Sequence, residues 1–100
     1  MHYQIEIQQK FDELLRIKFL ELQSVNKWNQ TMWHKDGRVI VSLVHLSKKS
    51  KFCFFNNPNL KVGKNQRWSA TIYSNNVEVS ENDKVDWKSV SEHIEKTIAL

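Results

Sequence analysis

Cysteine, proline and glycine are scarce in this 100-residue chain, which contains one, one and two of them. Because Cys53 is the only cysteine, an intramolecular disulfide and a zinc site built from several cysteines are excluded, which favours the reducing cytoplasm. No stretch approaches the roughly 18 apolar residues that span a bilayer, and residues 1–13 lack the basic and apolar regions of a signal peptide. We therefore expect a single cytoplasmic domain over residues 1–100 that is neither exported nor inserted in a membrane.

Basic charge is concentrated in the middle of the chain. Residues 38–68 contain no acidic side chain and carry seven basic ones: Arg38, Lys48, Lys49, Lys51, Lys61, Lys64 and Arg67. The remaining segments hold eight basic and eleven acidic residues, which leaves the stated net charge of +4. If the chain attracts an anionic partner, this central segment is where we expect the contact.

The N-terminal segment has the pattern of an amphipathic helix, because apolar residues recur every three or four positions over residues 5–28. Three further apolar residues widen this stripe beyond one face: Ile17, Phe19 and Leu20. Either the helix is buried on two sides, or it breaks near Ser24 and Asn26. We expect the break, before Trp28.

Strands and a second helix follow. "KDG" at 35–37 indicates a hairpin between "TMW" and "RVIVSLVHL", since Gly37 tolerates a positive φ. "KFCFF" and "RWSATIY" are two further strands separated by a loop with Pro58, and "VEV" is a candidate fifth. Asp86 is a suitable N-cap for a helix with the apolar stripe Trp87, Val90, Ile94, Thr97 and Ile98. The order predicts an α+β two-layer sandwich with an antiparallel meander of four to five strands between two helices.

Alternation along the strands assigns side chains to the two faces of the sheet. Toward the helices we expect Val39, Val41, Leu43, Phe52, Phe54, Trp68, Ala70 and Ile72. The opposite face then carries Ile40, Val44, Phe55 and Tyr73 beside Arg38, Ser42, Cys53 and Thr71. Two helices cannot cover both faces, and an uncovered face with this much apolar surface is typical of a site for a partner or ligand.

Residues 27–100 carry a family resemblance. "NKWNQTMWHKDGRVIVSLVHLSKKSKFCFFNNPNL", "VGKNQRWSATIYS" and "VDWKSVSEHIEKTIAL" follow one another in order, and together they resemble the bacterial YdhG-like family. The shared features are a Lys-Trp pair before the first strand, an Asp-Gly hairpin, a strand that ends in Phe before a polar loop, a Gly-Lys…Arg segment and a closing helix. The resemblance implies a frataxin-like α-β-α sandwich and, for part of the family, iron delivery; for most members it implies no established activity.

The residues themselves give little support to iron binding, because iron prefers clustered carboxylates. The acidic residues of the first helix, Glu6, Asp12, Glu13 and Glu21, are interleaved with Lys10, Arg16 and Lys18. A solvated helix face explains this mixture better than a metal site does. We expect no bound metal and no cofactor, with an iron chaperone as a second alternative.

Catalytic interpretations are weaker still. Cys53 and His45 are a nucleophile and a base by type, but a thiol within a strand among phenylalanines is normally buried and inert. His34 and His45 lie on adjacent predicted strands, yet two imidazoles without a nearby carboxylate make an incomplete metal site. We expect no enzymatic activity.

Nucleic-acid binding is the main alternative function, since residues 48–68 interleave lysines with aromatics, as sheets that bind single strands do. Trp33, Phe55 and Tyr73 are the candidate stacking platforms. Against this function, the net charge is moderate and the sheet motif of known RNA-binding domains is absent.

The sequence thus predicts a small non-catalytic binding domain. Its working surface would be the helix-free sheet face and the basic loops beside it, and its ligand a protein, a second copy of the chain or a small molecule. The candidate binding residues are Trp33, Arg38, Ile40, Val44, Phe55, Tyr73, Lys48, Lys49, Lys51, Lys61, Lys64 and Arg67.

Overall fold

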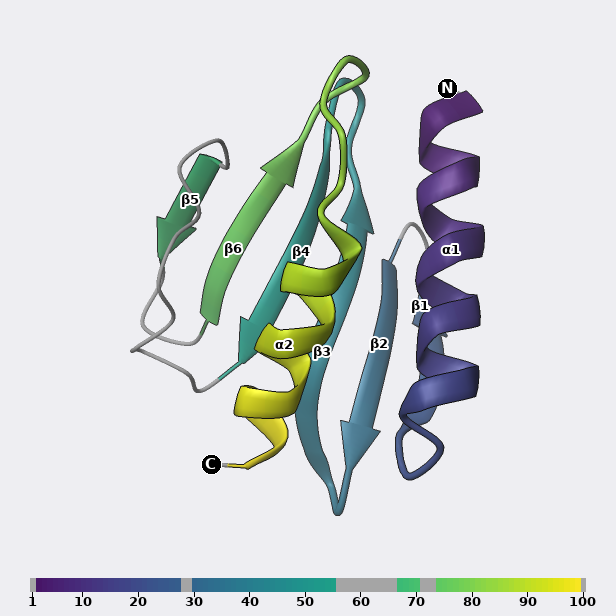
Figure 1. Cartoon of the computed structure of the whole chain (residues 1–100), viewed down its shortest axis with the longest axis vertical. Coiled ribbons are helices and arrows are strands. Elements are labelled where there is room, and N and C mark those ends of the chain that lie inside the picture. The colour runs from purple at the N-terminus through teal and green to yellow at the C-terminus, as the bar shows by residue number, and fades with distance from the viewer. Residues whose placement is uncertain (1, 28–29, 56–66, 71–73, 100) are drawn as a thin grey trace.

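The computed structural model describes residues 2–27, 30–55, 67–70 and 74–99. The elements follow in the order α1 (His2–Lys18), β1 (Gln23–Lys27), β2 (Gln30–Lys35), β3 (Arg38–His45), β4 (Ser50–Phe55), β5 (Arg67–Ala70), β6 (Ser74–Val79) and α2 (Trp87–Ile98). Figure 1 shows both helices on the same face of an antiparallel sheet, with neither of them on its other face. The predicted α+β sandwich, with a helix before and a helix after the sheet, is confirmed.

The sheet has six described strands in the order β1-β2-β3-β4-β6-β5, and every neighbouring pair is antiparallel. The sequence did not reveal β1, because its residues were assigned to the helix and the turn after it. Instead α1 ends at Lys18, Phe19 and Leu22 are buried in the following turn, and β1 pairs with β2. The order also departs from a simple meander, because β6 lies between β4 and β5.

Two local signals in the sequence act as expected. Asp36 and Gly37 both have positive φ, 52° and 77°, which is the two-residue hairpin turn whose twist matches the flanking strands. At α2 the Asp86 carboxylate accepts a hydrogen bond of 3.1 Å from the backbone N–H of Ser89, so it satisfies one of the free donors at the helix start.

The core lies between the sheet and the two helices. Val41 stands opposite Phe54 and Leu43 opposite Phe52, so these side chains share a face, and all four are fully buried. The helices contribute the buried side chains Phe11, Leu15, Val90 and Ile94, with Ile98 partly buried. Burial of each large apolar side chain stabilises the fold by about 1.5–3 kcal/mol. The expected core is confirmed at these positions; Ile72 and the side chains of Trp68 and Ala70 lie outside the described part.

A bulge in β3 corrects the predicted faces. Trp33 pairs with Val41 but the next residue of β2, His34, pairs with Val39, so Ile40 is an extra residue in β3. Such an insertion reverses the alternation on one side of it. Ile40 therefore enters the core and is fully buried, whereas Val39 turns to the helix-free face and is only half-buried. Our prediction for this pair was wrong, because period-2 counting through β3 contains no signal for the insertion.

The same bulge moves Trp33 and Arg38 from the predicted binding face to the helix side. Trp33 is 6% exposed and meets the Phe11 ring edge-on, with ring centroids 6.5 Å apart. The Arg38 guanidinium donates to the carbonyl oxygens of Thr97 and Ile98, at 3.1 and 3.3 Å. A cation in this place donates to carbonyls of the last turn of α2 and interacts favourably with the helix dipole. Both residues therefore stabilise the fold and do not belong to the helix-free face.

A partly buried polar network ties α1 to the sheet. The Gln8 amide donates to Asp12 Oδ1 (2.9 Å) and to Thr31 Oγ1 (3.1 Å), which leaves Gln8 Oε1 to accept from His45 Nε2 at 2.9 Å. His45 Nδ1 lies 2.7 Å from Ser50 Oγ, within hydrogen-bond distance. Because Gln8 Oε1 can only accept, His45 Nε2 carries a proton. Burial lowers the pKa of His45 from 6.5, and the Asp12 carboxylate opposes this effect.

The bulge yields a stability prediction. Ile40→Ala should lower the free energy of unfolding by about 2–5 kcal/mol, because it leaves a cavity in the core. Val39→Ala should cost less than about 1 kcal/mol, since Val39 is already half-exposed. Urea unfolding of the two variants measures both values. A larger loss for Val39→Ala than for Ile40→Ala would mean that β3 alternates without a bulge.

The His45 network yields a prediction about pH. Because the folded-state pKa lies below 6.5, the unfolded chain binds more protons in this range, and stability should fall as pH drops below 6.5. Asp12→Asn should extend the loss to lower pH, since it removes the charge that opposes the lowered pKa, and His45→Gln should flatten the profile. Urea unfolding at a series of pH values between about 5 and 8 tests this. The idea fails if His45→Gln retains the wild-type pH dependence.

Candidate functional site

The helix-free face of the sheet is the first candidate surface, and we call it the open face. Its described side chains are Gln23, Val25, Gln30, Met32, His34, Val39, Ser42, Val44, Lys51, Cys53, Phe55, Asn76 and Glu78, as the strand register and the bulge require. Val44 and Phe55 are on this face as predicted. Met32 and Val39 were missed, because the bulge exchanges them with Trp33 and Ile40, and Val25 was missed with β1.

Apolar side chains form a strip across the open face. Val25 is 40% exposed, and four more apolar side chains are half-buried: Met32, Val39, Val44 and Phe55. Ser42, Cys53 and Asn76 form a buried row of shorter side chains in line with Val25 and Met32, with Val44 on one side of the row and Val39 and Phe55 on the other. The strip therefore extends over β1, β2, β3 and β4 and has larger side chains on both sides of a low centre.

The predicted basic surface is only partly present among the described residues. Lys49 forms an ion pair with Glu78 of β6, with Lys49 Nζ 3.1 Å from the carboxylate, and Lys51 stands directly opposite Glu78 across the sheet. Lys48 is exposed in the β3–β4 turn. Lys61, Lys64 and Tyr73 lie outside the described residues, and Arg67 is described only by its backbone in β5. Glu78, which is distant in the sequence, thus lies beside lysines from a segment that contains no acidic residue of its own.

The Cys53 thiol is held in its protonated form. Cys53 is buried at the middle of β4 and pairs directly with Ser42. Burial raises the pKa of this thiol, and the Ser42 hydroxyl and the Lys51 ammonium oppose the effect. A thiol in this state is a weak nucleophile, which agrees with a packing role.

His45 cannot serve Cys53 as a base, because the two side chains lie on opposite faces of the sheet. Cys53 faces the open face, whereas His45 faces α1 and contacts Ser50 and Gln8. The Ser50–His45 contact has the residue types of a nucleophile and its base. However, Ser50 is fully buried, so a substrate has no access to its hydroxyl.

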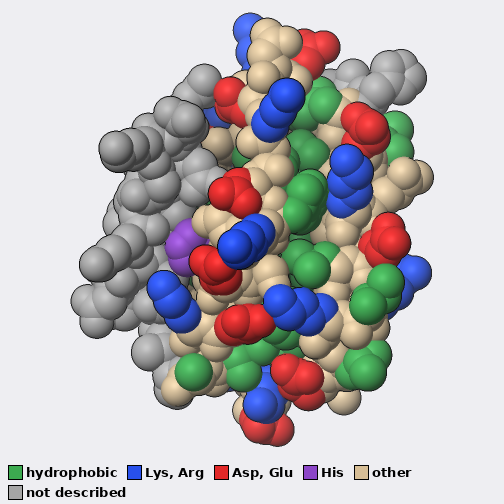
Figure 2. All heavy atoms as spheres, in the orientation of Figure 1, with side chains coloured by type: hydrophobic (Ala, Val, Ile, Leu, Met, Phe, Trp, Pro, Cys, Tyr) green, Lys and Arg blue, Asp and Glu red, His purple; other side chains and the backbone are tan. Residues whose placement is uncertain are grey.

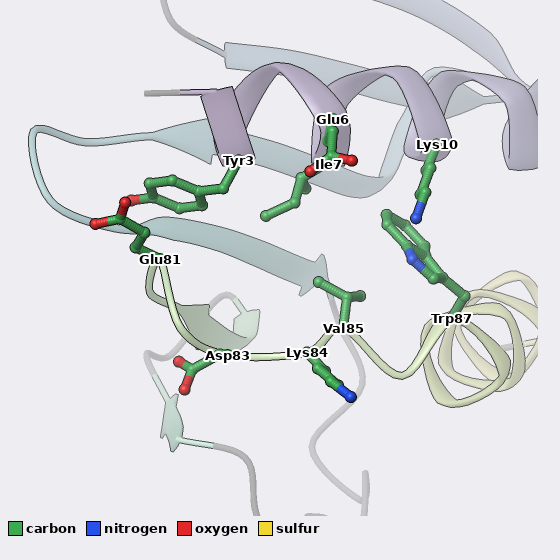
Figure 3. Close-up of a pocket in the computed structure, with 9 residues that line it drawn as sticks. All are labelled: Tyr3, Glu6, Ile7, Lys10, Glu81, Asp83, Lys84, Val85 and Trp87. Atoms are coloured by element: carbon green, nitrogen blue, oxygen red, sulfur yellow. The ribbon is translucent and has the colours of Figure 1, made fainter.

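A second concave feature lies on the helix side and was not predicted. It is a hollow of about 360 Å³ between α1 and the segment that leads from β6 into α2. Figure 3 shows Ile7 and Val85 between the rings of Tyr3 and Trp87, whereas Asp83 and Lys84 project away from α1. Asp83 also accepts a hydrogen bond of 2.8 Å from the backbone of Ser80. The hollow therefore has an apolar floor with charged side chains at its edge.

The described part of the chain contains neither a cluster of metal ligands nor a helix that could cross a membrane. Within the described ranges, no three His, Cys, Asp or Glu side chains lie close enough to hold a metal ion. Neither α1 nor α2, the helices of the described part, combines the length and apolarity needed to cross a membrane.

Comparison of the chain with protein-family models, with curated proteins and with solved structures finds no significant match. The similarity to the YdhG-like family therefore stays a prediction from the sequence.

Proposed function

We propose that this chain is a non-catalytic binding domain, active in the cytoplasm, that engages a protein partner through its open face. One observation carries the proposal: the strip of partly exposed apolar side chains, Val25, Met32, Val39, Val44 and Phe55, on the side of the sheet opposite both helices. Apolar surface that is left in contact with water in this way is stabilised when a partner covers it.

The extent of the strip favours a protein over a small molecule. It runs across four strands, which at a spacing of about 4.8 Å is roughly 15 Å from β1 to β4. Polar side chains flank it, among them Gln30, Lys51 and Glu78. Apolar side chains with a polar margin are the usual arrangement of a protein–protein interface, whereas small ligands prefer deeper concave sites.

Nucleic-acid binding is less well supported by the described residues. A phosphate backbone is bound by unpaired cations, and each neutralised lysine reduces that attraction. Lys49 is already paired with Glu78, and Lys51 shares that carboxylate as its cross-strand neighbour. Trp33, one of the three proposed stacking platforms, is buried under α1. We therefore rank a protein partner first.

Site-specific photo-crosslinking in cells tests the proposal. A benzophenone amino acid at Val44 should give a discrete covalent adduct with another protein, because Val44 lies on the open face. The matched control places the same amino acid at Gln9, an exposed position on α1, and should not give that adduct. Mass spectrometry of the adduct shows whether the crosslinked molecule is a protein or a nucleic acid.

Two outcomes would reject a protein partner on the open face. One is the absence of any adduct from position 44, and the other is the same set of adducts from both positions. An adduct with nucleic acid would support the alternative function instead.

A further inference from the structure

α1 has a second apolar stripe that the fold leaves uncovered. Its main stripe packs on the sheet, but Ile17 is 71% exposed and Leu20, just after the helix, is 80% exposed. Leu14 is half-buried between the two stripes. The sequence alone indicated that the stripe is too wide for one face, and a helix with this pattern is normally buried on two sides.

A groove between the helices adjoins this stripe. It has a volume of about 510 Å³ and is lined by Lys10, Glu13, Leu14, Ile17, Lys18 and Trp87. Because Lys10 and Trp87 also line the hollow of Figure 3, the two depressions are neighbours along α1. Figure 2 shows hydrophobic side chains in a line between the two helices, with charged side chains on both sides. We call this surface the helix groove.

The helix groove is bordered at one end by a polar link between the helices. Lys18 Nζ lies 2.9 Å from Glu95 Oε1 and 2.6 Å from Ser91 Oγ of α2. This link sets the positions of the two helices beside the groove, so the apolar surface is preformed. A preformed surface loses less conformational entropy when it is covered.

We propose that a second copy of this chain covers the helix groove, with the two α1 helices packed antiparallel about a two-fold axis. The charges along the groove side of α1 are Glu6, Lys10, Glu13 and Lys18, which alternate in sign. In a two-fold arrangement centred between residues 11 and 12, Lys10 of each copy faces Glu13 of the other. The pairing is self-complementary, as a two-fold interface requires.

The same register brings Ile17 of each copy to the hollow of the other. Ile17 falls opposite Glu6, at the edge of the hollow whose floor includes Ile7 and Trp87. Leu20 lies in the turn after α1, beyond the helical register. A parallel arrangement would place like charges together instead.

The helix side is also large enough for a stable dimer. Figure 1 views the molecule down its shortest axis, and the two longer extents are 34 and 26 Å. A standard interface covers about 800 Å² on each partner. The exposed charges of α2, Lys88, Glu92, Glu95 and Lys96, would form the polar margin of such an interface. The dimer leaves the open face free, so it does not depend on the proposed function.

Charge reversal tests the register. Sedimentation equilibrium of the wild-type chain over a wide concentration range should show a monomer–dimer equilibrium. Lys10→Glu and Glu13→Lys should each raise the dimer dissociation constant about tenfold or more, because each puts like charges together twice. The double variant with both changes should restore the wild-type constant within about threefold, since it recreates both pairs with exchanged signs.

Two further variants complete the experiment. Ile17→Glu should abolish dimerisation while leaving the circular dichroism spectrum of the monomer unchanged, because the side chain is exposed. Arg16→Glu is the control: it makes a comparable charge change on the same helix but lies about 120° away from Lys10. A wild-type chain that stays monomeric at all concentrations, or a double variant that stays as weak as the single ones, would overturn the proposal.

Discussion

The bulge at Ile40 is the constraint on which the two surfaces of this protein depend. One extra residue in β3 places Ile40 and Val41 together opposite Trp33. As a result Trp33 and Ile40 both join the core, Arg38 reaches the last carbonyls of α2, and Val39 is left on the open face. Without the insertion, strict alternation would bury Val39 and expose a tryptophan. The bulge therefore determines both how α1 and α2 are held and which side chains remain for a partner.

Placing both helices on one side of the sheet creates two unequal surfaces. The open face has a strip of apolar side chains on regular strands and is the more suitable surface for a protein partner. The helix side is mostly charged, and among its described apolar residues Leu14, Ile17 and Trp87 line the groove between α1 and α2, whereas Ile5 and Leu20 are exposed outside it. The two proposals concern opposite sides of the molecule, so a dimer formed through the helices would present two open faces outward.

His45 and Cys53 both have structural roles in the fold. His45 joins α1 to the β3–β4 hairpin through Gln8 and Ser50, and burial favours its neutral form. Cys53 packs beside Ser42 with its thiol protonated. These residue types are frequent in catalytic sites, but here each is either inaccessible or on the wrong face to act with the other.

Apart from β1, the sequence by itself determined the order of elements, and it also determined the Asp36–Gly37 turn, the Asp86 cap and the main core residues of β4 and α2. These features arise from local spacing and backbone preference, which the residues nearby specify. The tertiary structure alone decided the strand β1, the bulge and the position of Glu78 beside Lys49. Each of these depends on which distant segments pair. Ser24 and Asn26 adopt a strand conformation because they pair with β2. Pairing of β6 with β4 brings Glu78 to a basic segment that contains no acidic residue. Pairing of distant strands follows from the total burial of the core, and no short window of sequence contains that information.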